Sequence, residues 1–290
     1  MKAWLFIIFT GAMFASLGLS TKFLTNRGVD PMVCAAVPFA LSAAVTLALH
    51  PWNTPTPWRE GLAMGAINAA IPALLFNIGF DRLPASLVTL TLALGPVFTA
   101  LTAHFAFRDD RFSRVKLAGL GFSFGGVALL AGLRDDSGSE STLAFVATLV
   151  GAALSGATLV WVRGMATRHN PMIVLAPMQT GAAVVAVAAA AFAGFPIWDP
   201  GADSLELGIL AIMGIGTVIA YVGALKASEL AAASKVGLMG YLVPLVGVGG
   251  GVLIFNEALT ANLLLGGLLI LAGVTLVGRA NRSQAVGSPV

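Results

Sequence analysis

Residues 85–107, ASLVTLTLALGPVFTALTAHFAF, reveal how this 290-residue chain is organised, because residues 233–255, ASKVGLMGYLVPLVGVGGGVLIF, repeat their pattern. The two stretches align without a gap at an offset of 148, which pairs Pro96 with Pro244. The match continues through the following loop into the next apolar stretch, where leucines and glycines pair at the same offset. Such a match across two apolar stretches and their loop predicts an internal duplication.

The composition identifies the class of protein. Hydrophobic residues make up 58% of the chain and charged residues 10%, whereas a globular domain carries about 25% charged residues. Neither a soluble domain nor a disordered chain has this composition. The single cysteine, Cys34, excludes a disulfide framework. We therefore expect an all-α polytopic membrane protein.

Ten apolar stretches are long enough to cross a bilayer, which takes about 20 residues. We expect these spans at residues 3–22, 31–50, 60–80, 84–106, 114–133, 142–165, 171–194, 206–226, 230–254 and 262–279. With the duplication they predict a first five-helix repeat over 1–137, a second over 138–280 and a disordered tail over 281–290. Because five is odd, the second repeat crosses in the opposite sense. This 5+5 inverted repeat around a central cavity is typical of secondary transporters.

The basic residues predict the orientation. With a cytoplasmic N-terminus, twelve lysines and arginines fall in inner loops and four in outer loops. The positive-inside rule therefore places both termini of this multi-pass protein in the cytoplasm.

The chain resembles the EamA-type members of the drug/metabolite transporter superfamily, and among them the YddG-type amino-acid exporters. The resemblance rests on the two aligned stretches with Pro96 and Pro244, and on the acidic element that ends each of them, Phe255-Asn256-Glu257 and, less closely, Phe107-Arg108-Asp109. It implies a basket in which helices one, three, four, six, eight and nine surround a cavity. It also implies export of aromatic and other amino acids across a bacterial inner membrane.

Ionisable residues are scarce in the middle of the expected spans, where each costs about 2.5–3.5 kcal/mol. This scarcity favours facilitated diffusion over proton coupling through a buried acid. It also disfavours phosphorylated substrates, and the absence of clustered nucleophiles, acids or metal ligands disfavours an enzyme. We expect a small-molecule substrate and the lipid bilayer as partners, no nucleic acid and no cofactor. The oligomeric state stays open, with a monomer as one alternative.

Neutral polar and aromatic residues in the spans are therefore the candidate substrate ligands. They are Met13, Ser16, Asn68, Thr89, Ser155, Thr158, Trp161, Thr217, Tyr221 and Tyr241. Each has a structural alternative. Serine and threonine often bond a carbonyl of their own helix, Asn68 can bond another helix, and aromatic residues form interfacial belts.

Three further residues have proposed roles in the transport cycle. Pro96 and Pro244 each remove a backbone hydrogen bond and are candidate hinges of alternating access, with a static kink as the alternative. Lys22, at the outer end of the first span, either reaches the lipid headgroups or attracts a substrate carboxylate at the outer mouth.

The leading functional hypothesis is an inner-membrane transporter that exports amino acids, or facilitates their diffusion, by alternating access. The alternative is an exporter of another small metabolite or a hydrophobic drug, with proton coupling left open.

Overall fold

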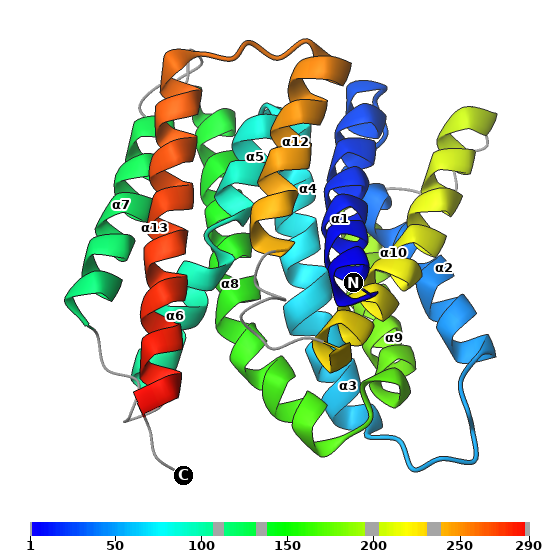
Figure 1. The fold of residues 1–290 in the computed structure, drawn as a ribbon. Coiled ribbons are helices and arrows are strands. Elements are labelled where there is room, and N and C mark those ends of the chain that lie inside the picture. Colours follow the sequence, from blue (N-terminus) through cyan, green and yellow to red (C-terminus); the bar gives the residue numbers. More distant parts are fainter. Residues whose placement is uncertain (1, 107–112, 132–137, 195–202, 231–238, 288–290) are drawn as a thin grey trace.

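The computed structural model describes residues 2–106, 113–131, 138–194, 203–230 and 239–287, and every regular element in these ranges is a helix (Figure 1). The first half contains α1 (Lys2–Asn26), α2 (Val33–Ala48), α3 (Trp58–Met64), the π-helix η1 (Gly65–Ala70), α4 (Ile71–Arg82), α5 (Ala85–Leu92), α6 (Gly95–Ala106) and α7 (Arg114–Ala131). The second half contains α8 (Ser139–Arg168), α9 (Pro171–Phe192), α10 (Ser204–Leu230), α12 (Met239–Phe255) and α13 (Ala261–Gly287).

Eight helical stretches in the described residues are long and apolar enough to span a membrane. One of them combines α3, η1 and α4, and another combines α5 and α6. Two shorter apolar helices, Val33–Ala48 and Leu242–Phe255, lie where the sequence predicts a second and a ninth span. At 1.5 Å per residue, the 16 residues of α2 reach about 24 Å, less than a hydrocarbon core of about 30 Å. The structure thus supports a multi-pass helical protein with eight clear spans, and the count of ten remains a proposal.

Two segments differ from the sequence-based prediction. The predicted ninth span began at residue 230, whereas α12 begins at Met239 and residues 231–238 lie outside the described ranges. At the C-terminus, α13 continues to Gly287, into the stretch 281–290 for which the sequence predicted a disordered tail.

The helix bundle has two ends, the Glu257 end and the Glu60 end. The Glu257 end is where α1, α4 and α12 finish and α5, α8, α10 and α13 begin, at the top of Figure 1. The Glu60 end is the opposite one, where α2 and α8 finish and α3 and α9 begin. The predicted orientation makes the Glu257 end extracellular.

The helices pack in a regular set of pairs. Helix α1 lies against α10 and α12, and α8 lies against α4 and α6. Helix α2 packs on α9 and α10, while α9 packs on α2, α3 and η1. The pairs α7 with α13 and α5 with α12 complete the bundle.

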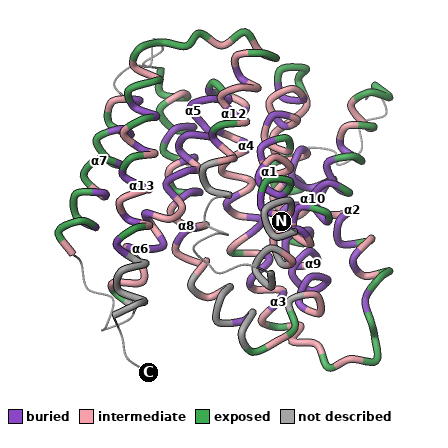
Figure 2. Tube along the Cα trace, viewed as in Figure 1, coloured by how far each residue is buried: buried purple, intermediate pink, exposed green. Residues whose placement is uncertain are grey.

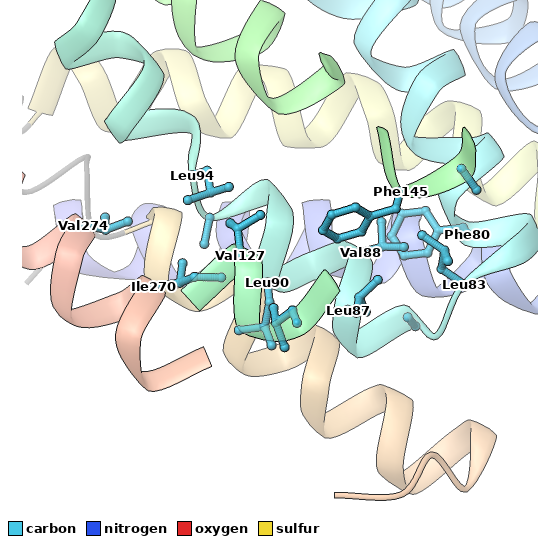
Figure 3. Packing of buried hydrophobic residues seen from close by; sticks show 14 of the residues in the cluster. Phe80, Leu83, Leu87, Val88, Leu90, Leu94, Val127, Phe145, Ile270 and Val274 are labelled. Carbon is cyan, nitrogen blue, oxygen red and sulfur yellow. The ribbon is translucent and has the colours of Figure 1, made fainter. Parts of the chain in front are cut away.

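The largest buried cluster surrounds α5 (Figure 3). Leu87, Val88 and Leu90 of α5 contact side chains from α4, α7, α8 and α13, including Phe80, Val127, Phe145 and Ile270. Apolar side chains also cover the outer faces, where green segments alternate with buried ones in Figure 2. Phe105, Phe192 and Leu253 are at least 80% exposed, as expected for residues that face lipid.

Two spans depart from a regular α-helix. In η1 the Ile71 N–H bonds the Ala66 carbonyl, five residues back, and Pro72 has no N–H to offer the Asn68 carbonyl. Between α5 and α6 the Ala93 and Leu94 N–H groups bond carbonyls three residues back, at 3.2 and 3.1 Å. The interruption expected at Pro96 is therefore present at residues 93–94, just before α6, in which Pro96 is the second residue.

Glycine permits the closest helix contact at Gly65, because a Cβ there would overlap the Met178 carbonyl of α9. We expect Gly65→Ala to destabilise the protein by about 1–3 kcal/mol, since backbone atoms must move apart. Thermal unfolding in detergent measures this loss. Gly121→Ala is the matched control, because a Cβ at Gly121 meets nothing within 4 Å. Equal melting temperatures for the two variants would contradict the packing described here.

Candidate functional site

A hydrogen bond between two halves of the chain marks the centre of the candidate site. The Asn68 Nδ2 of η1 donates to the Thr158 Oγ1 of α8 at 2.7 Å, across 90 residues of sequence. Thr158 Oγ1 in turn donates to the Leu154 carbonyl at 2.7 Å and lies 3.3 Å from the Ser155 carbonyl. Both side chains are half-buried. Asn68 sits in a π-helical turn, a feature that is frequent at functional sites.

Two aromatic side chains pack on a buried cluster that includes Ala69, the residue after Asn68. Trp161, one turn beyond Thr158, and Tyr221 of α10 pack against the same buried cluster of α2, η1, α8 and α9 residues. Tyr221 also meets Phe14 of α1 edge to face, with ring centroids 5.6 Å apart. The structure therefore joins Asn68 to Thr158 directly and places Trp161 one turn away, while Tyr221 packs on the same buried cluster as Trp161 and contacts Phe14.

Met13 belongs to the seam between α1 and α10, and Thr217 is a buried residue of α10. A Cβ at Gly216 would lie 3.2 Å from the Met13 Cε, so the methionine covers that part of α10. Thr217 is 6% exposed, and its hydroxyl donates to the Met213 carbonyl at 2.8 Å. The Thr217 hydroxyl thus follows the structural alternative, a bond within its own helix.

The remaining predicted ligands lie apart from this centre. Ser16 is exposed, bonds the Ala12 carbonyl at 2.9 Å and, with Ser20, lines a groove of about 270 Å³ between α1, α10 and α12. Thr89 is 1% exposed and faces Gly247 of α12. Ser155 is half-buried on α8, and the side chain of Tyr241 lies outside the described part of the structure.

The two prolines differ in their surroundings. The span that contains Pro96 is broken into α5 and α6, whereas α12 continues as one helix through the buried Pro244. The loosened turn is thus confirmed for Pro96, while the hinge role of both prolines stays a prediction.

Charges lie at the ends of the bundle. Each Asp, Glu, Lys or Arg inside the eight apolar spans is within five residues of a span end. At the Glu257 end, Arg27 pairs with Asp203 and Glu206 at 3.1 and 3.0 Å, and Arg82 pairs with Glu140. Lys22 is half-buried at this end and is attracted by Glu257 and Asp81. Within the described residues, no three His, Cys, Asp or Glu side chains gather as a metal site requires.

Sequence reasoning missed two residues near the site. Phe14 shows no pattern that separates it from a lipid-facing phenylalanine, and only its contact with Tyr221 reveals it. Gln179 of α9 is fully buried, and its amide atoms have no hydrogen-bond partner in the described residues. A glutamine in an alanine-rich span could have been recognised from the sequence as a candidate functional residue, because a side-chain amide is costly to bury without hydrogen bonds.

The family and the relatives that match this chain by sequence are all transporters. The sequence profile of the EamA-like transporter family matches residues 1–132 and 142–279. An uncharacterized transporter of Archaeoglobus fulgidus is 22% identical over 96% of this chain and 99% of its own. The uncharacterized transporter YvbV of Bacillus subtilis is 24% identical over 81% of this chain and 77% of its own. One crystal structure of a protein shares the fold, with a TM-score of 0.66, 20% identity and 99% coverage of both chains.

A double-mutant cycle tests the central hydrogen bond. For Asn68→Ala, Thr158→Val and the double variant, we expect a coupling of about 0.6 kcal/mol, and at most about 1.7 kcal/mol, in the free energy of unfolding, as for other such bonds in membranes. Unfolding in mixed micelles measures it. Strict additivity of the two substitutions would show that these side chains do not interact.

Proposed function

The chain belongs to the EamA-like transporter family, and from this premise we propose that it transports amino acids, aromatic and other neutral ones, by alternating access. The supporting observation is the character of the candidate site. Asn68 and Thr158 supply uncharged hydrogen-bonding groups. Trp161, one turn from Thr158, and Tyr221, on the same buried cluster as Trp161, supply flat apolar surfaces. A zwitterion with an apolar side chain requires both.

The distribution of charge supports the proposal for a neutral substrate. Aspartate, glutamate, lysine and arginine stand only near the ends of the eight apolar spans, so a substrate with net charge would lack a counter-ion at mid-depth. The same distribution favours facilitated diffusion over coupling to protons through a buried carboxylate.

Helix packing supports the proposed 5+5 inverted repeat of residues 1–137 and 138–280. In that scheme α1 and α8 are equivalent, as are α4 and α10, and α6 and α12. Helix α1 packs on α10 and α12, while α8 packs on α4 and α6. Each first helix thus lies against the third and fourth helices of the other half, as an inverted repeat requires.

Two ion pairs relate the two halves in the same way as the helix contacts. Arg27 follows α1 and pairs with Glu206 in the first turn of α10, at 3.0 Å. Arg168 ends α8 and faces Glu60 in the first turn of α3, at 3.8 Å. The first pair lies at the Glu257 end and the second at the Glu60 end. Equivalent contacts at opposite ends support a duplicated chain that crosses the membrane in opposite senses.

In the proposed cycle, the spans that contain Pro96 and Pro244 exchange their contacts between the two ends. Helix α5 packs on α12 toward the Glu257 end, whereas α6, beyond the break, packs on α8 and α13. The proposed setting is a bacterial inner membrane with both termini cytoplasmic, so the contact between α5 and α12 lies at the end that faces outward in this proposal.

Uptake of a labelled aromatic amino acid into proteoliposomes tests the proposed function. We expect saturable uptake without an imposed ion gradient, inhibited by unlabelled neutral amino acids and unaffected by anionic ones. Strict dependence on a proton gradient would overturn facilitated diffusion, and competition only by other metabolites or hydrophobic drugs would overturn the amino-acid assignment.

Site variants test the location of the cavity. Trp161→Ala and Thr158→Val should raise the apparent KM about two- to tenfold, because each removes a contact worth about 0.5–1.5 kcal/mol. Trp52→Ala is the matched control, since Trp52 is 66% exposed in the loop between α2 and α3. If neither site variant changes the apparent KM, the substrate binds elsewhere.

A further inference from the structure

The start of α5 is capped by a residue from the other half of the chain. Glu257 accepts hydrogen bonds from the Ser86 N–H at 3.0 Å and from the Ala85 N–H, 171 and 172 residues away in sequence. A carboxylate at a helix N-terminus satisfies otherwise unpaired N–H groups and interacts favourably with the helix dipole. This contact joins the loop after α12 directly to α5.

No local residue replaces this cap. The N-cap position of α5 is Pro84, which makes no side-chain hydrogen bond to the helix. In α9 the equivalent task is performed locally, because the Asn170 side chain accepts from the Met172 N–H at 3.0 Å. The α5 N–H groups therefore lose their described partner whenever the Glu257 loop moves away.

The turn that carries Glu257 is well defined. Asn256 adopts a left-handed conformation with φ 54°, which asparagine tolerates better than most residues. The Glu257 N–H then donates to the Gly251 carbonyl at 3.1 Å. A Cβ added to Gly251 would overlap a carboxylate oxygen of Glu257, so the glycine leaves the space that the carboxylate occupies.

The cap lies at one end of the seam between α5 and α12. Gly251 lies beside the Ser86 N–H, and Gly247 lies against Thr89, which gives an antiparallel register. Continued by one turn, this register brings the break at residues 93–94 level with Pro244. The seam thus extends from Glu257 to the point where the span that begins with α5 is broken and α12 contains Pro244.

A third helix contributes charge to the same place. Lys22 of α1 is half-buried and is attracted by both Glu257 and Asp81. The carboxylate of Glu257 therefore connects α12 to α5 by hydrogen bonds and to α1 by charge.

We propose that Glu257 is the latch that holds the Glu257 end of the transporter closed, and that opening of this end requires its carboxylate to leave the N-terminus of α5. The proposal rests on the alternating access proposed above and adds to it the group that controls one gate. Loss of the cap exposes the Ala85 and Ser86 N–H groups and frees α12 to separate from α5.

Cysteine accessibility tests the latch without any substrate. In a Cys34→Ser background, which removes the one native cysteine, Thr89→Cys places a reporter that is 1% exposed in the α5–α12 seam. We expect Glu257→Gln to increase the labelling rate of this reporter by an impermeant maleimide in nanodiscs about fivefold, because a neutral amide loses the charge-assisted part of the cap.

A second variant separates the geometry of the latch from its charge. Gly251→Ala retains Glu257 but displaces its carboxylate, so it should increase labelling of the Thr89→Cys reporter to a similar extent. Glu140→Gln removes a carboxylate at the same end of the bundle, one that pairs with Arg82, and should leave the labelling rate unchanged.

A second reporter excludes general loosening. Thr148→Cys is equally buried and faces Gly79 in the seam between α8 and α4, which Glu257 does not touch. It should label slowly in every variant. The proposal is overturned if Glu257→Gln and Gly251→Ala leave the Thr89→Cys rate unchanged, or if they increase both reporters equally. Labelling that follows the prediction in a protein without amino-acid transport would contradict the proposed function and leave the latch intact.

Discussion

The structure depends on one constraint of the membrane, which is that backbone N–H and C=O groups find no water there and must be bonded within the protein. Most spans meet it as uninterrupted helices. The interrupted ones need substitutes: η1 has a bond across five residues, the break at 93–94 has bonds across three, and α5 has the Glu257 carboxylate. Each substitute is a place where the chain can change its bonding pattern.

The residues of the candidate site and of the proposed latch lie at these irregular places. Asn68 lies in η1 and donates a hydrogen bond to Thr158 in the opposite half, so this bond between two polar side chains joins the two halves. The broken span and α12 share the seam that Glu257 closes. Charged residues stay at the span ends, which leaves a neutral interior. The proposed small neutral substrate and the proposed movement between the two halves both rest on this arrangement.

Sequence patterns predicted the helical class, most span positions and the interruption at Pro96, because hydrophobicity and proline act locally. They did not predict which helices meet. Thr10, Met13 and Ser16 share a helical stripe, yet Thr10 is buried and Ser16 is exposed, since periodicity fixes a face but not its neighbour. The partners of Asn68 and Glu257, 90 and 172 residues away, follow from tertiary packing alone.

The central claim is that the two halves exchange which end of the bundle is closed. Pulsed electron-spin distance measurements test it, with one label pair at Pro84 and Leu259 near the Glu257 end and a second joining the ends of α6 and α10 near the Glu60 end. Addition of a transported substrate should change the two distance distributions in opposite directions. Unchanged distributions, or a change of both in the same direction, would contradict alternating access.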